Sequence, residues 1–293
     1  MTGPRPLVLS LFAAMALACL SLQAQSPAPA RPRTSTPRAP ASRPATPRPP
    51  TPAATAAPVE RPVPFQAGEQ LSYDIAWSSY LTAATATVTV REKRPSFDST
   101  AYYIVAEGRP TSFVAALYQL YYKADTLLDA FTLLPQRGAI FSVEGRRTSL
   151  RAITFDHTLR EAAYEVQSGT PLTRKSEARI SLPPSTQDAL SAIYALRALP
   201  MKTGTQVQVP VILNGELYRL NVSIGGVESV TCGLGSISAW KITPVIRAEG
   251  PNPDERELTV YLSNDARRLP VLMRAKLPIG SFTLTLREAA GTK

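Results

Sequence analysis

The chain has 293 residues, a formal net charge of +10 and 44% hydrophobic residues, enough apolar side chain for a sizeable core. Its 28 prolines outnumber its 15 glycines, and 13 of these prolines lie between Pro27 and Pro64. A proline-rich segment joined to a globular domain is therefore expected, not a fibrous protein. One histidine (His157) and two cysteines (Cys19, Cys232) exclude a structural zinc site built from these residue types, which needs four ligands.

The N-terminus is typical of an export signal. Arg5 precedes Leu7–Leu20, a mostly apolar run that is shorter than the roughly 20 residues of a bilayer span. We predict a signal peptide over residues 1–24, cleaved before Gln25, and a periplasmic location. Ala16-Leu17-Ala18 before Cys19 leaves an alternative open, in which Cys19 is lipidated and anchors a lipoprotein.

Residues 25–62 are predicted to be a disordered tether. Large apolar side chains are almost absent before Val59, and frequent proline favours extended polyproline II. Six arginines and one glutamate give the segment a net charge of +5. It could bind an anionic envelope polymer or serve only as a charged spacer, and an exported chain makes nucleic acid a poor partner.

A single β-rich domain is expected over residues 63–288, followed by a tail at 289–293. Runs with strand-forming composition or period-two alternation recur along it. Asn214-Gly215 is the clearest signal for a two-residue hairpin turn. The predicted strands are Leu71–Trp77, Thr85–Val90, Ala101–Ala106, Ala139–Val143, Thr148–Phe155, Ala162–Val166, Ala178–Leu182, Gln206–Leu213, Leu217–Ile224, Ile237–Ile246, Leu258–Leu262, Val271–Lys276 and Phe282–Leu286.

Two segments have helical spacing instead. Apolar residues from Phe113 to Tyr121 follow Pro110, with Leu117 and Leu120 on the same stripe. In the second segment, Ser185 is a candidate N-cap and Asp188 its capping-box partner, ahead of an apolar stripe that ends at Leu199-Pro200. We therefore expect a mainly β fold: a curved antiparallel sheet or incomplete barrel with two packed α-helices.

Three separated stretches resemble the bacterial family called domain of unknown function 3108. Phe65–Trp77 resembles the opening strand of the family, and Gln187–Arg197 resembles its central helix. Leu258–Val271 resembles a late strand, the turn after it and the following strand. The resemblance spans nearly all of the predicted domain. It implies an exported protein without an assigned activity, and it supplies no catalytic residues to transfer.

No group of residues predicts a reaction. His157 follows Asp156 at the end of a predicted strand, where a turn is expected, and no nucleophile motif accompanies it. Cys232 lies among strand-forming residues and is interpreted as a buried, inert thiol. We predict no catalytic residue, no metal, no cofactor and no enzyme activity.

One concentration of aromatic residues is the candidate ligand site. Tyrosines within and on either side of the first predicted helix could line a cavity between that helix and the sheet, although core packing with hydroxyl groups reaching the surface is the simpler explanation. These residues are Tyr102, Tyr103, Tyr118, Tyr121 and Tyr122.

Three hypotheses for function remain open. The first is an exported cell-envelope protein without catalytic activity that binds a lipid or other apolar ligand in a β-sheet cavity of several hundred Å³. The second is a structural or assembly module with a solid core, which binds envelope partners through a face or sheet edge. A hydrolase acting on envelope polymers is the third. The oligomeric state is left unassigned.

Overall fold

The computed structural model describes residues 59–78, 81–248, 255–277 and 280–293. The expected signal peptide, the alternative lipidation site at Cys19 and nearly all of the expected tether lie outside these described residues. Neither helix in the described part of the chain combines the length and apolar character needed to cross a bilayer.

Strands make up most of the described chain, and they all belong to one sheet. The strands are β1 (Gln70–Trp77), β2 (Leu81–Ser96), β3 (Ser99–Pro110), β4 (Leu120–Asp129), β5 (Pro135–Glu144), β6 (Arg147–Asp156), β7 (Glu161–Ser168), β8 (Thr173–Ser181), β9 (Gln187–Asp188), β10 (Gln206–Leu213), β11 (Glu216–Cys232), β12 (Gly235–Ala248), β13 (Glu255–Ser263), β14 (Pro270–Leu277) and β15 (Gly280–Ala290). Two helices accompany them, α1 (Ser112–Leu117) and α2 (Ala189–Arg197).

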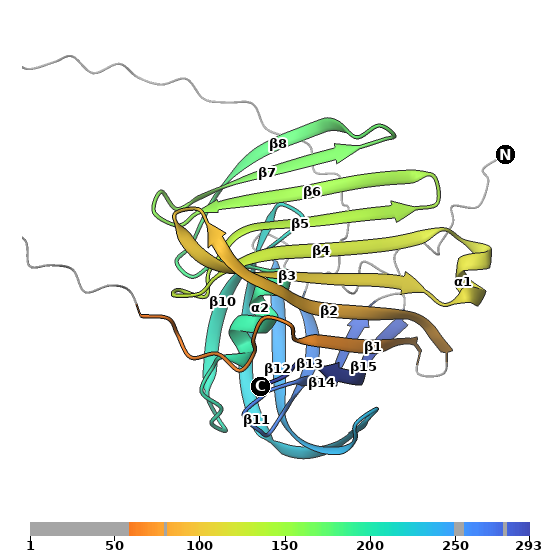
Figure 1. Cartoon of the computed structure of the whole chain (residues 1–293), viewed down its shortest axis with the longest axis vertical. Helices are drawn as coiled ribbons and strands as arrows, with labels where there is room; N and C mark the ends of the chain where they lie inside the picture. The colour runs from red at the N-terminus through yellow and green to blue at the C-terminus, as the bar shows by residue number, and fades with distance from the viewer. Residues whose placement is uncertain (1–58, 79–80, 249–254, 278–279) are drawn as a thin grey trace, which may run out of the picture. The chain divides into compact units, whose positions relative to one another are not determined.

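The sheet is a long antiparallel meander. The first and last strands of the chain lie next to each other in the middle of it. Its order is β8-β7-β6-β5-β4-β3-β2-β1-β15-β14-β13-β12-β11-β10-β9, and only β9 pairs in parallel, with β10. β1 pairs with both β2 and β15, so the first and last strands are neighbours. Figure 1 shows the resulting two arms, which run from β1 to β8 and from β15 to β10. The expected fold class is confirmed: the sheet is curved, antiparallel and not closed into a barrel.

Bulges bend this sheet at several places. The pairing register shifts between Ser72 and Tyr73 in β1, between Val90 and Glu92 in β2, and between Ile224 and Val227 in β11. An extra residue on one strand bends it and increases its right-handed twist. The long strands β2 and β11 therefore curve, which brings distant parts of the sheet towards one another.

The predicted strands correspond closely to the observed ones. Each of the thirteen predicted ranges overlaps a strand, and β10 has the predicted bounds, Gln206–Leu213. The Asn214-Gly215 turn is confirmed: Leu213 pairs with Glu216, and both turn residues have positive φ angles of 51° and 85°. At the C-terminus β15 continues to Ala290, two residues into the expected tail.

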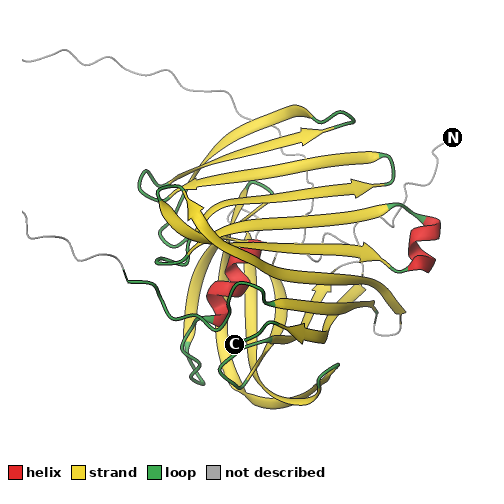
Figure 2. Cartoon of the chain, in the orientation of Figure 1, coloured by secondary structure: helices red, strands yellow, loops and turns green. Residues whose placement is uncertain are grey.

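The first helix is shorter than the spacing predicts. α1 ends at Leu117, and Leu120 and Tyr121 belong to β4, which pairs with β3 and β5. None of its side chains is buried, so it projects from the sheet instead of packing on it (Figure 2). The apolar residues of β4 continued the helical spacing by coincidence, and pairing between strands overrode it.

The second helix, by contrast, lies between the two arms of the sheet. On one side Leu190 and Tyr194 join a core cluster with Phe65, Ile104 and Leu128. On the other side Leu196 packs with residues of β10 to β13, among them Val211, Val222, Ile242 and Leu262. α2 contacts both β4 and β10, so it separates two walls of the same sheet.

Beyond α2 the two arms meet through side chains. Ile153, Phe155, Ala162 and Leu182, from β6, β7 and the segment after β8, pack against Ile212 of β10. The two arms are joined by the pairing of β1 with β15, but within the described residues no strand pairing joins them here, because β8 and β9 are the ends of the strand order. We call this contact the edge seam.

Candidate functional site

The start of α2 fixes a buried carboxyl group between the arms. The Asp188 carboxylate accepts hydrogen bonds from the amides of Leu190 and Ser191, both at 2.8 Å, and from the Thr126 hydroxyl of β4 at 2.6 Å. Ser191 completes the capping box by accepting from the Asp188 amide at 2.9 Å. The predicted cap at Ser185 is therefore wrong by three residues: Asp188 is itself the N-cap, and Ser185 has a φ of 64°.

A cavity of about 70 Å³ lies beside this helix start. Its walls come from β3–β7, α2 and the β10–β11 turn, and they are mainly apolar. Residues facing it include Ala106, Ala124, Gly138, Ile153, Tyr164, Ala189, Leu190, Ile193, Ile212 and Gly215. Ile153 and Ile212 also belong to the edge seam, so the cavity reaches the contact between the two arms. We call it the α2 cavity.

Small side chains account for this space. Ala106 pairs with Ala124 across β3 and β4, so two neighbouring positions of the wall leave room in front of α2. Gly138 lies next to Thr126 in the register, and a Cβ atom added to it would lie 3.0 Å from an Asp188 carboxylate oxygen. The close approach of α2 to β5 therefore requires a very small residue at position 138.

A second cavity, of about 50 Å³, lies on the opposite side of α2, against β10–β13. Ala189, Ile193 and Leu213 line both cavities, so the helix divides one apolar region into two parts. Both cavities are much smaller than the apolar cavity of several hundred Å³ expected from the sequence. A hollow of about 640 Å³ next to β1 and β13–β15 has a mixed lining, with Arg274, Lys276 and three threonines along it.

The electrostatic environment of the α2 cavity disfavours negative charge. Burial raises the pKa of the Asp188 carboxyl above its usual range, although the Ser191 amide and the Thr126 hydroxyl act in the opposite direction. Burial likewise raises the pKa of Asp125, which also lines the cavity, against the opposing effect of Arg137. Burial therefore penalises the charged form of both carboxyl groups, while the basic side chain of Arg151 also lines the cavity.

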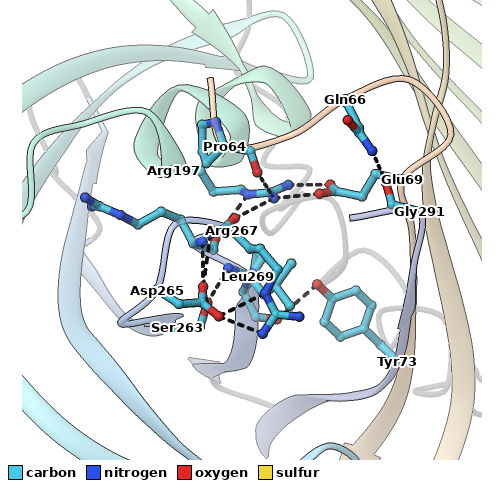
Figure 3. Close-up of polar contacts among 12 residues, drawn as sticks. Pro64, Gln66, Glu69, Tyr73, Arg197, Ser263, Asp265, Arg267, Leu269 and Gly291 are labelled. Atoms are coloured by element: carbon cyan, nitrogen blue, oxygen red, sulfur yellow. Dashed lines mark hydrogen bonds and ion pairs between the residues drawn. The ribbon is translucent and has the colours of Figure 1, made fainter. Parts of the chain in front are cut away.

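The C-terminal end of α2 is held by a buried ion pair. Arg197 donates to both carboxylate oxygens of Glu69, at 2.6 and 2.8 Å, and both side chains are fully buried. The same guanidinium donates to the carbonyl oxygens of Pro64, Arg267 and Arg268 (Figure 3). We call these five residues the Arg197 clamp. It joins the segment before β1, α2 and the β13–β14 turn, because one planar group can serve several acceptors.

The five tyrosines predicted as a ligand site do not gather around one cavity. Tyr102 and Tyr122 are buried in different core clusters. Tyr103 contacts Arg94, and Tyr121 contacts Arg109 and Phe141. Tyr118 ends α1 and lies against Gly145. None of the five lines the α2 cavity, and ligand binding by them stays a prediction.

The residues considered for catalysis also lie apart. The His157 ring contacts the Pro135 carbonyl oxygen at 2.8 Å through Nε2 and stacks on Phe155. Cys232 is a free, half-buried thiol at the end of β11. Within the described residues no group of three or more histidine, cysteine, aspartate or glutamate side chains could hold a metal.

Local sequence patterns do not reveal the residues of the Arg197 clamp. Neither Glu69 nor Arg197 belongs to a motif that predicts an ion pair. A basic residue at the end of the apolar stripe of α2 was the available signal, but its partner lies 128 positions earlier in the chain. Such a pair is recognised only when the fold brings the two positions together.

The family model for the protein family of unknown function DUF3108 matches residues 72–287. The chain belongs to the DUF3108 family. The resemblance seen in three stretches of the sequence is thereby confirmed. No curated protein matches the chain.

Three solved structures are similar to this DUF3108 protein. A beta-barrel-like DUF1849 protein from Brucella abortus is 11% identical, with a TM-score of 0.48, over 77% of this chain and 98% of its own. A candidate exported protein with a YmcC-like fold from Bacteroides fragilis is 11% identical (TM-score 0.34; 78% and 97% covered). A candidate lipoprotein from Parabacteroides distasonis is 9% identical (TM-score 0.36; 78% and 98% covered). TM-scores this low support no functional inference.

Proposed function

We propose that this DUF3108 protein is an exported cell-envelope protein without catalytic activity, and that it binds the end of an apolar chain, such as a lipid acyl chain, in the α2 cavity. The observation that carries the proposal is an apolar cavity that reaches the edge seam, where no strand pairing closes the sheet. Export is inferred from the N-terminal apolar run of the sequence.

The edge seam supplies a route for a ligand. Separating paired strands breaks a ladder of hydrogen bonds, whereas separating the seam exposes apolar side chains that an acyl chain would cover again. The cavity of about 70 Å³ accommodates a short apolar segment, well below the 300–1,000 Å³ of a typical ligand pocket. We therefore propose that the chain enters at the seam and that only its end reaches α2.

The small volume is also the observation that favours the alternative, a structural or assembly module. In that case the two cavities beside α2 are packing defects, and the domain acts through its surface. The two functions make opposite predictions for protein purified from its own cell envelope: the first predicts a bound lipid, and the second predicts none.

Native mass spectrometry of the full chain, purified from its own cell envelope, tests the proposal. We expect a reproducible additional mass that matches a lipid or fatty acid. A fluorescent fatty acid then gives a binding curve for the apo protein and for two variants. Ala124→Leu fills the α2 cavity and is expected to weaken binding by about tenfold or more, because the end of the ligand then loses an apolar burial of about 1.5–3 kcal/mol.

Ala163→Leu is the matched control, because Ala163 is exposed on β7 and does not line the cavity. It should bind the fatty acid as the unmodified chain does. If both variants bind the fatty acid equally well, the binding site is not the α2 cavity, and the proposed site is wrong. If the purified protein carries no additional mass and the apo protein does not bind the fatty acid, the proposed function is wrong and the structural or assembly module is favoured.

A further inference from the structure

The short helix α1 presents an apolar surface that the fold does not use. Phe113 is 67% exposed and Leu117 is 73% exposed, and no residue of the helix is buried. Residues four apart lie on the same face of a helix, so the two large side chains form one patch. Figure 1 shows α1 beyond the ends of β3 and β4, clear of both arms of the sheet.

This projection is held in place at both ends. The Thr111 amide donates to Ala83 at 3.0 Å before the helix, and the Gly145 amide donates to Gln119 at 2.8 Å after it. A helix of six residues has little stability of its own in water. The neighbouring strands therefore supply the order of α1, and the apolar patch is displayed in a fixed position.

Basic residues flank α1 in the sequence and in the neighbouring turn. The stretch from Pro110 to Tyr122 contains no charged residue, but Arg109 precedes it and Lys123 follows it. The β5–β6 turn, which the Gly145 hydrogen bond places beside the end of α1, adds Arg146 and Arg147. Both are exposed, and neither forms an ion pair with a described residue.

The nearby acidic groups are already engaged. Glu144 accepts a hydrogen bond from the Tyr122 hydroxyl. Glu107 lies within 4 Å of both Arg91 and Arg109, at 3.9 and 3.8 Å. The arginines of the β5–β6 turn therefore remain available for an external anionic partner.

We propose that α1 docks on an anionic lipid surface, with Phe113 and Leu117 inserted at the level of the headgroups and with Arg146 and Arg147 on the lipid phosphates. Apolar side chains ringed by arginine or lysine are typical of segments that bind at the membrane interface. The patch is too small for a stable protein interface, which needs about 800 Å² on each partner. Insertion into lipid requires no complementary surface of that size.

Vesicle flotation tests the docking surface with the full chain. We expect binding to vesicles of phosphatidylglycerol and phosphatidylcholine, and much weaker binding to phosphatidylcholine alone. The double variant Phe113→Ser/Leu117→Ser should bind anionic vesicles at least about tenfold more weakly. Arg146→Gln/Arg147→Gln should weaken vesicle binding by a similar factor, because each basic residue contributes about 1 kcal/mol near an anionic surface. This loss should occur only with anionic vesicles.

Leu159→Ser is the matched control. Leu159 is 70% exposed, but it lies in the β6–β7 turn, at the opposite end of these strands from α1. This variant should bind like the unmodified chain, and any attraction of the basic tether for vesicles is common to every variant. Retained binding by Phe113→Ser/Leu117→Ser, or no binding by the unmodified chain, would overturn the proposal.

A positional readout makes the test independent of the fatty acid experiment. Tryptophan introduced as Phe113→Trp should be quenched by brominated lipids in anionic vesicles, whereas Leu159→Trp should not. The opposite pattern would show that the protein binds through another face. Because the readout is the depth of α1, it holds whether or not the α2 cavity contains a ligand.

Discussion

At the scale of single residues, the Arg197 clamp is the most constrained arrangement in the described chain. A charge in the protein interior is costly unless it is paired and hydrogen-bonded, and here one guanidinium serves one carboxylate and three carbonyl groups. The clamp draws its members from both arms and from α2. Its loss would therefore affect the position of the helix as well as the local packing.

Glu69→Gln should lower the free energy of unfolding by roughly 3–5 kcal/mol, because it leaves the Arg197 charge buried without a counter-charge. Glu92→Gln is the control: its ion pair with Arg94 is 2.9 Å long but about half exposed, and such pairs contribute at most about 1 kcal/mol. Urea denaturation measures both values. Equal losses for the two variants would show that the clamp does not carry the stability assigned to it.

At the scale of elements, the two helices have opposite relations to the sheet. α2 begins with a complete capping box and ends in the Arg197 clamp, with apolar side chains packed on both walls. α1 has no side-chain cap and no buried residue. Helical spacing was present in both segments of the sequence, so periodicity did not distinguish a core helix from a projecting one.

One leucine from each helix gives a matched comparison. Leu196→Ala should destabilise the protein by roughly 2–5 kcal/mol, since Leu196 is 8% exposed within the core between α2 and β10–β13. Leu117→Ala should change the free energy of unfolding by less than about 0.5 kcal/mol, because the side chain is 73% exposed. Thermal unfolding of the two variants and of the unmodified chain measures these changes in stability. A large loss for Leu117→Ala would mean that α1 packs against the domain.

At the scale of the whole molecule, the open sheet leaves β8 as an edge strand, which among the described residues pairs only with β7. Eight of its nine residues are exposed, and Arg174, Lys175, Glu177 and Arg179 lie among them. Charged side chains on an edge strand oppose pairing with a second copy of the chain. This edge is therefore a poor place for strand addition by a partner.

Lys175→Val/Arg179→Val should convert this edge into an association surface. We expect dimers or larger species in sedimentation velocity at concentrations where the unmodified chain shows fewer of them. The control Lys123→Val/Arg137→Val removes the same charge from β4 and β5 at positions that are paired on both sides. Association of the control alone, or of both variants equally, would attribute the effect to net charge instead of the edge.

Local patterns were sufficient for much of the fold. Alternation predicted most strands, the Asn214-Gly215 turn fixed the β10–β11 register, and three short stretches indicated the family. β4 was missed because Leu120 and Tyr121 continued the helical spacing of α1, and β9 was missed because two residues are too few for a pattern. The capping box was predicted from the correct residue types but at the wrong position.

The sequence by itself determined the strand-rich class, the central helix and the family, because these depend on neighbours within a few positions along the chain. The tertiary structure decided that α2 stands between two arms, that Glu69 meets Arg197, and that the five tyrosines separate. It also decided the size of the α2 cavity. These features depend on contacts between distant residues, such as Glu69 and Arg197, which are 128 positions apart, and no local period encodes them.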